Sequence, residues 1–164
     1  MRTHWWIRKT SAMALELQLA DALDPGTKVP AQTRFDGWLD GIRLELSDPR
    51  LSRDICVRLC DAEESAALNG NYRDKPYATN VLSFPAGDAH ASLPLGDLAI
   101  CLPVVAAEAV EQGKRMEDHL AHLFVHGTLH LLGFDHEDAH AAQEMERLEV
   151  AILARLRIAD PYHS

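Results

Sequence analysis

Six of the nine histidines of this chain fall between His119 and His140, and the run H-G-T-L-H-L-L-G-F-D-H, which begins at His126, also contains His130 and His136. On an α-helix, a spacing of four residues places His126 and His130 on one face, about 6 Å apart along the axis. Gly133 suits the left-handed conformation that ends many helices, so the chain can turn there and bring His136 back toward the other two. We therefore expect these three histidines to bind one transition-metal ion, for which zinc is the best candidate.

Three protein ligands leave the fourth position of a tetrahedral zinc ion open for water. Such a water can have a pKa of about 7, so this arrangement is typical of hydrolytic rather than structural zinc sites. A single histidine is more often a solvated or core residue, but the spacing and the glycine together favour a metal site. Zinc proteases of the H-E-x-x-H type carry a general-base glutamate where this chain has Gly127, so a peptidase would lack its proton-transfer residue.

The neighbouring polar residues allow other interpretations. His122 precedes His126 by four residues, but a ligand set of all three helical histidines would span about 12 Å, which is too long for one ion with bonds of ~2.0 Å. We expect His119 and His140 to be surface residues. Asp135 can either close the loop or accept a hydrogen bond from a histidine N–H.

The elements that position these ligands follow from the hydrophobic pattern and from the glycines and prolines. Alternating or β-branched apolar runs predict strands at 14–19, 55–60, 79–84 and 95–102. Apolar residues three to four positions apart predict helices at 31–46, 104–112, 116–132 and 139–156. Asp61 with Glu64 predicts a short capped helix through Leu68, followed by a polar connection at 69–76. The interleaved order indicates an α+β fold, in which about five helices pack on a small four-stranded mixed sheet and the metal site lies at a helix end and the following loop.

The composition is that of one globular domain, with 164 residues, of which 47% are hydrophobic and 25% charged. We assign residues 13–160 to this domain and residues 1–12, which lack periodicity, to a poorly ordered N-terminal extension. Apolar runs of membrane-spanning length and a signal-peptide pattern are both lacking, so we expect a cytoplasmic protein with no membrane partner.

Cysteine spacing and net charge bear on two further possibilities, a thiolate zinc site and a nucleic-acid partner. Cys56, Cys60 and Cys101 lack the C-x-x-C spacing of a thiolate zinc site, and we expect them in or near the core. The net charge of -9 argues mildly against broad electrostatic binding to nucleic acid, which needs lysine and arginine concentrated on one surface. Charge alone therefore does not suggest an RNA partner.

The histidine run matches every fixed position of H-G-x-L-H-L-x-G-x-D-H, and the sequence resembles the YbeY family of metal-dependent single-strand endoribonucleases, which carries that signature. The resemblance extends in order from about Met13 to Ile152. A second block resembles the family's block around its active-site arginine, which corresponds to Arg73, and consists of Leu68-Asn69, Tyr72-Arg73, Lys75-Pro76 and Thr79 to Pro85. Gly96-Asp97, Met145 and Glu149 continue the resemblance. The one departure is Tyr77-Ala78, which separates Pro76 from Thr79.

The resemblance implies a single-strand-specific endoribonuclease that matures the 3′ end of 16S rRNA and takes part in ribosome quality control. Its implied partners are single-stranded RNA and the ribosome or small ribosomal subunit, with no role for DNA. Arg73 and His126 are the expected catalytic residues, with Arg73 neutralising charge on the phosphate. Without the resemblance, Arg73 would be interpreted as an exposed loop cation beside Lys75.

Two other classes compete with a nuclease. A noncatalytic ribosome-assembly factor that uses the metal only for folding predicts a closed site with four protein ligands. A zinc amidohydrolase or peptidase would act on small substrates. For RNA, the aromatic residues that could stack on bases are Tyr72, Tyr77 and Phe84, but strand aromatics are more often core residues, so the candidates are Tyr72 and Tyr77. Gly127 can either let substrate or backbone approach the metal closely or allow the helix to pack closely against a strand.

Overall fold

The computed structural model describes residues 15–90 and 92–163. The expected extension at 1–12 and the start of the first strand lie outside this part of the chain. The four strands form one mixed sheet in the order β1-β2-β4-β3. Strands β1 (Leu15–Leu19), β2 (Ile55–Cys60) and β4 (Gly96–Cys101) are parallel, and β3 (Val81–Pro85) is an antiparallel edge strand next to β4. The predicted α+β class and mixed sheet are confirmed.

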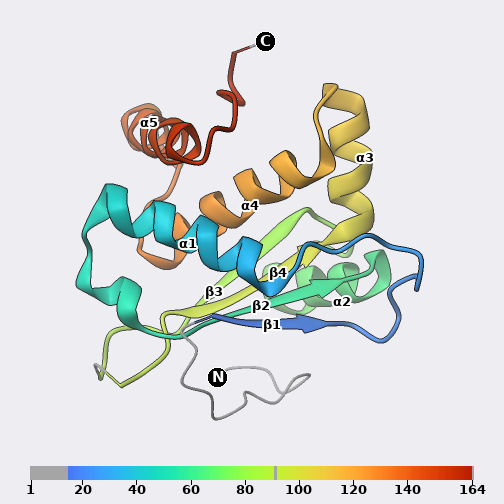
Figure 1. The fold of residues 1–164 in the computed structure, drawn as a ribbon. Coiled ribbons are helices and arrows are strands. Elements are labelled where there is room, and N and C mark those ends of the chain that lie inside the picture. Colours follow the sequence, from blue (N-terminus) through green and yellow to red (C-terminus); the bar gives the residue numbers. More distant parts are fainter. Residues whose placement is uncertain (1–14, 91, 164) are drawn as a thin grey trace.

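The helices are α1 (Gln32–Leu46), α2 (Ala62–Arg73), α3 (Leu102–Gln112), α4 (Met116–Leu131) and α5 (Ala139–Arg155), with a 3₁₀ turn at Pro49–Ser52. Helices α1 and α4 cover one face of the sheet, and α5 packs on the outer side of both (Figure 1). Helix α3 follows β4 directly and packs against α4. Helix α4, which carries His126 and His130, is therefore enclosed between the sheet and α5.

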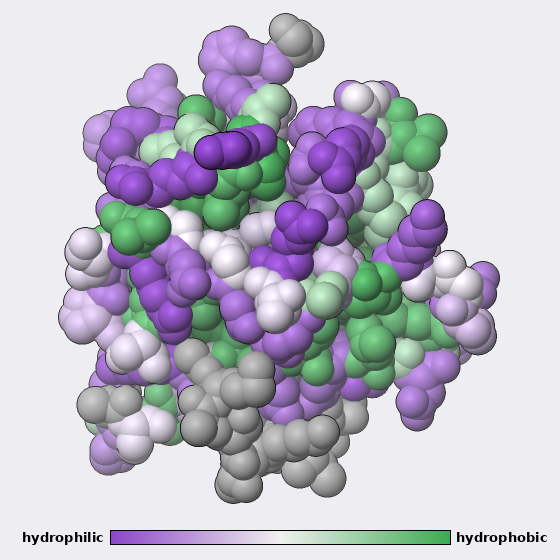
Figure 2. Space-filling model, in the orientation of Figure 1, coloured by the Kyte–Doolittle hydropathy of each residue, from purple (hydrophilic) through white to green (hydrophobic). Residues whose placement is uncertain are grey.

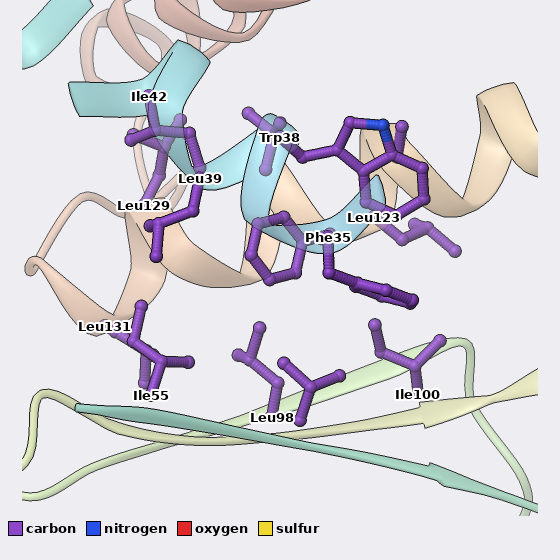
Figure 3. Packing of buried hydrophobic residues seen from close by; sticks show 14 of the residues in the cluster. Phe35, Trp38, Leu39, Ile42, Ile55, Leu98, Ile100, Leu123, Leu129 and Leu131 are labelled. Atoms are coloured by element: carbon purple, nitrogen blue, oxygen red, sulfur yellow. The ribbon is translucent and has the colours of Figure 1, made fainter. Parts of the chain in front are cut away.

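The main core holds α4 in place against the sheet. Phe35 and Trp38 of α1 contact Phe124 of α4, with ring centroids 5.8 and 6.0 Å apart. Below them lie Leu98 and Ile100 of β4, which point up from the sheet toward the two helices (Figure 3). Since interiors pack at crystal-like density, this layer leaves α4 little freedom to shift.

The three cysteines are buried free thiols, as expected. Cys60 lies opposite Cys101 in the register of β2 and β4.

Helix α2 is longer than the predicted segment that ended at Leu68. Asp61 caps it by accepting the Glu64 N–H at 2.9 Å, but the helix continues to Arg73. Asparagine and glycine in 69–71 have low helix propensity, and tertiary packing overrides it here. Leu68 packs on Leu82 and Ala99, on the opposite sheet face from the main core. The prediction of a polar connection at 69–76 was wrong for residues 69–73, which belong to helix α2.

Hydrophilic residues cover much of the face in Figure 2, with hydrophobic residues in separate patches. Among the residues that the structure describes, every helix is too short or too polar to cross a membrane.

The packing of α4 on the sheet explains Gly127. A Cβ there would lie 2.9 Å from Leu98 Cδ2 and 3.2 Å from Val81 Cγ2. Both distances are shorter than ordinary carbon contacts, so a larger residue at position 127 must displace the side chains of Leu98 and Val81. Of the two roles expected for Gly127, the structure supports close packing against a strand.

We predict that Gly127→Ala lowers the free energy of unfolding by about 1–3 kcal/mol, because the clash exceeds the gain in helix propensity. Gly37→Ala in α1 is the matched control, since Gly37 is exposed and a Cβ there meets no atom within 4 Å. That substitution should stabilise the protein by about 0.5–1 kcal/mol. Urea unfolding measures both, and equal effects of the two substitutions would contradict the packing argument.

Candidate metal centre

His126, His130 and His136 form the one cluster of three or more potential ligands found in residues 15–90 and 92–163. One ligand atom of each lies within 4.8 Å of the others. The Nε2 atoms of His126 and His130 are 3.1 Å apart. Two ligands of a tetrahedral zinc ion with bonds of ~2.0 Å are separated by about 3.3 Å. The spacing of this pair therefore fits a shared metal ion.

The ligand geometry depends on how α4 ends. The Gly133 N–H donates to the His130 carbonyl at 3.0 Å, and the Phe134 N–H donates to the Leu129 carbonyl at 3.1 Å. This pair of bonds is the Schellman motif, which requires a left-handed residue, and Gly133 has φ +98°. Phe134 then packs against the core, and the chain reverses to bring His136 toward α4. The predicted glycine stop is confirmed.

The charge state of His130 favours metal binding. Burial, together with the nearby His126 and His136, lowers the pKa of His130 to about 4. The imidazole is therefore neutral at pH 7, as a metal ligand must be. The lowered pKa also means that His130 itself resists protonation in mildly acidic solution.

A cleft of about 330 Å³ opens beside the three histidines. The edge strand β3 and the residues before it form one wall, and Arg73, Lys75 and Tyr77 line the same cleft. The Arg73 side chain is exposed, and its guanidinium group makes no hydrogen bond or ion pair with any residue in 15–90 or 92–163. Its guanidinium group is thus available to an anionic ligand in the cleft. The structure brings Arg73 and the three histidines, four residues chosen from sequence, to one site.

Glu149 of α5 lies behind His126, and its side chain is 1% exposed. Its Oε2 is 2.7 Å from His126 Nδ1, and its Oε1 is 2.6 Å from His122 Nε2. Tyr162 also donates its hydroxyl to Oε1. Burial raises the pKa of the Glu149 carboxyl, but hydrogen bonds from His122 and His126 outweigh it and hold that pKa at about 2. Glu149 is therefore a buried carboxylate.

Sequence reasoning did not give Glu149 a role in the site. The available signal was its position on the buried face of α5, which otherwise carries Met145, Leu148 and Ile152. A charged residue on an apolar helix face is seldom buried without a partner. What the sequence could not supply was the partner, which depends on how α5 packs on α4.

The positions of the remaining histidines agree only in part with those expected from the sequence. His140 is exposed, but the surface assignment of His119 was wrong, because its side chain is buried and lies 2.9 Å from Glu108 Oε1. Burial lowers the pKa of His119, although Glu108 opposes this. His122 contacts Glu149 and is not part of the ligand cluster, as its distance along the helix predicted. Asp135 accepts the Glu137 N–H at 3.3 Å, which supports its loop-closing role.

The family model described as "Endoribonuclease YbeY" matches residues 29–157. The chain belongs to this family. An endoribonuclease YbeY of Stenotrophomonas maltophilia (strain R551-3) is 50% identical over 155 residues, which cover 90% of this chain and 93% of the relative. The endoribonuclease YbeY of Xylella fastidiosa (strain 9a5c) is 50% identical over 145 residues, covering 84% and 88% of the two chains.

A solved structure shares the fold of this chain. The solution structure of TM1509 from Thermotoga maritima superposes with a TM-score of 0.52 at 21% identity, over 92% of this chain and 96% of that one. At this identity the likeness concerns the fold alone. The YbeY resemblance noted from the histidine run is thus confirmed by matches over most of the chain.

The lowered pKa of His130 predicts how pH affects the metal-free protein. In the unfolded chain His130 has an ordinary pKa of about 6.5, so between roughly pH 6.5 and 4 the unfolded state binds a proton that the folded state does not. The free energy of unfolding should therefore fall as the pH is lowered through this range. His130→Gln should flatten the dependence by up to about 1.4 kcal/mol per pH unit.

Urea unfolding of chelator-treated protein at several pH values measures this slope. His140→Gln is the control, because His140 is exposed on α5 and should leave the slope unchanged. An identical slope in wild type and His130→Gln would show that His130 is not the group responsible.

Proposed function

We propose that the protein is a metal-dependent endoribonuclease that cleaves single-stranded RNA and acts in rRNA processing, including maturation of the 3′ end of 16S rRNA. The observation that carries the proposal is the presence of Arg73 in the same cleft as His126, His130 and His136. Its relatives at about 50% identity, named endoribonucleases, support RNA as the substrate.

The donor set suits zinc, because three neutral imidazole nitrogens with an open fourth position match a catalytic zinc site. A zinc ion bound there supplies Lewis acidity that polarises a phosphodiester oxygen or activates a water molecule. His126, His130 and His136 hold it without adding negative charge. Other divalent transition metals that accept imidazole are alternatives that metal analysis can distinguish.

Arg73 binds and orients the scissile phosphate. Its planar guanidinium can donate two parallel hydrogen bonds to phosphate oxygens, and it stabilises negative charge that develops there during cleavage. Lys75 adds a second positive charge to the cleft lining. This local concentration of cations answers the objection raised by the net charge of -9, since phosphate recognition needs only a local positive surface.

A preference for single strands is supported by the exposed aromatic side chain in the cleft. Tyr77 is 57% exposed and lines the cleft with Arg73. An unpaired base offers its face for stacking on such a ring, whereas the bases of a duplex are already stacked. Tyr72 is exposed but packs edge-on against Phe84, with centroids 5.4 Å apart, and Phe84 is partly buried. Tyr77 is therefore the best stacking candidate of the three.

The alternatives are less well supported. A structural metal site in an assembly factor would need a fourth protein ligand, whereas the cluster in the described residues has three members. A peptidase glutamate at position 127 would require Leu98 and Val81 to move. Association with the small ribosomal subunit and a cytoplasmic location follow from the proposed role in rRNA processing.

The test uses end-labelled RNA, as a single strand and as a duplex of the same sequence, with zinc-loaded wild type, His130→Ala and Arg73→Ala. We predict cleavage of the single strand alone. Arg73→Ala should reduce the rate about 100-fold and keep one zinc per chain, because Arg73 contacts substrate rather than metal. His130→Ala should lose both zinc and cleavage.

The matched controls are His140→Ala and Arg147→Ala, since both residues are exposed on α5 and outside the cleft lining. Both controls should retain wild-type rates. One bound zinc per chain without cleavage of any RNA would contradict the nuclease and favour the assembly factor. Cleavage that persists after chelation would contradict metal dependence.

A further inference from the structure

The buried carboxylate of Glu149 provides more than packing. Each of its oxygens faces a polar atom of another side chain: Oε2 faces His126 Nδ1, and Oε1 faces His122 Nε2 and the Tyr162 hydroxyl. An ionised carboxylate has no hydrogen to donate, so it can only accept hydrogen bonds from these groups. His126 must therefore carry its proton on Nδ1 to make the bond at 2.7 Å.

This bond determines which nitrogen of His126 is free. A neutral imidazole has one N–H and one lone pair, so a proton on Nδ1 leaves the lone pair on Nε2. The Nε2 atom is the one that lies 3.1 Å from His130 Nε2, inside the ligand cluster. The opposite tautomer would direct an N–H at the place where a metal ion binds.

We propose that Glu149 is a positioning residue of the metal centre, which accepts the Nδ1–H of His126 and so directs the Nε2 lone pair of His126 toward the metal. The inference rests on the metal site of the proposed function but does not require RNA cleavage. Acceptors of this kind orient a ligand ring and raise its basicity, and their loss typically weakens metal affinity 10–100-fold.

Glu149 itself is held in place from the side opposite His126. His122, one turn earlier on α4, and Tyr162 both bind Oε1, and Asp160 accepts the Tyr162 N–H at 2.8 Å. Burial and the nearby Glu149 raise the pKa of the Tyr162 hydroxyl, so it stays protonated and able to donate. These contacts fix the carboxylate against His126 and outside the cluster of ligand atoms. The C-terminal segment thus contributes to the metal site through Glu149.

The first test measures zinc affinity by competition with a chromophoric chelator. We expect Glu149→Ala to weaken binding about 10–100-fold and Glu149→Gln to weaken it less, because an amide oxygen is a poorer acceptor than a carboxylate. Both variants should still bind one zinc per chain. Glu108→Gln is the matched control, since Glu108 contacts His119, a buried histidine of α4 that is outside the ligand cluster. It should leave zinc affinity unchanged.

The second test needs neither metal nor activity. In metal-free wild type, ¹H–¹⁵N NMR of the imidazole of His126 should show a proton on Nδ1, and Glu149→Ala should shift the ring toward a mixture of tautomers. Circular dichroism establishes that the variants are folded.

A folded Glu149→Ala with wild-type zinc affinity, or a wild-type His126 protonated on Nε2, would overturn the positioning role. Loss of zinc affinity in Glu149→Ala together with a wild type that cleaves no RNA would overturn the nuclease and leave this inference standing. Loss of RNA cleavage in Glu149→Ala at saturating zinc, with unchanged zinc affinity, would count against the positioning role.

Discussion

The site depends on one constraint, that three neutral imidazoles must converge although two of them come from a helix and the third from the loop that follows. The Schellman turn at Gly133 satisfies it by reversing the chain directly after α4. The turn is effective only because α4 itself is fixed, by Phe124 in the aromatic contacts with α1 and by the close approach of Gly127 to β4. Core packing, helix termination and ligand geometry are therefore parts of one arrangement.

The same arrangement sets the electrostatics of the cleft. The three histidines offer lone pairs without charge, and the only carboxylate bound to any of them among the described residues, Glu149, is buried behind His126. The positive charge of a divalent cation at the cluster would therefore remain largely uncompensated toward the cleft. Arg73 and Lys75 line that side, so the cleft is suited to an anionic substrate in a chain of net charge -9.

Local features of the site could be predicted from the sequence. The four-residue spacing of His126 and His130, and the glycine stop after them, are properties of a single helix and its end. The strands were predicted within about two residues of their observed limits because their apolar runs are distinct. Arg73 was assigned through resemblance, and its assignment as a catalytic residue, like the domain limits, remains a prediction.

Features that depend on tertiary contacts could not be predicted in this way. Helix α2 extends past Leu68 because that residue packs on β3 and β4, which outweighs the poor helix propensity of its last turn. His119 is buried because Glu108 of α3 lies beside it, and Glu149 reaches His126 because α5 packs on α4. In each case the residue type is visible in the sequence but its partner is on another element.

We infer that His126, His130 and His136 bind one metal ion and leave one coordination position open. A crystal structure of zinc-loaded protein, with anomalous diffraction recorded on both sides of the zinc absorption edge, tests it most directly. We predict one strong anomalous peak per chain, at ~2.0–2.1 Å from one nitrogen of each histidine and with no fourth protein ligand. A peak at other residues, or a fourth side chain closing the coordination sphere, would contradict it.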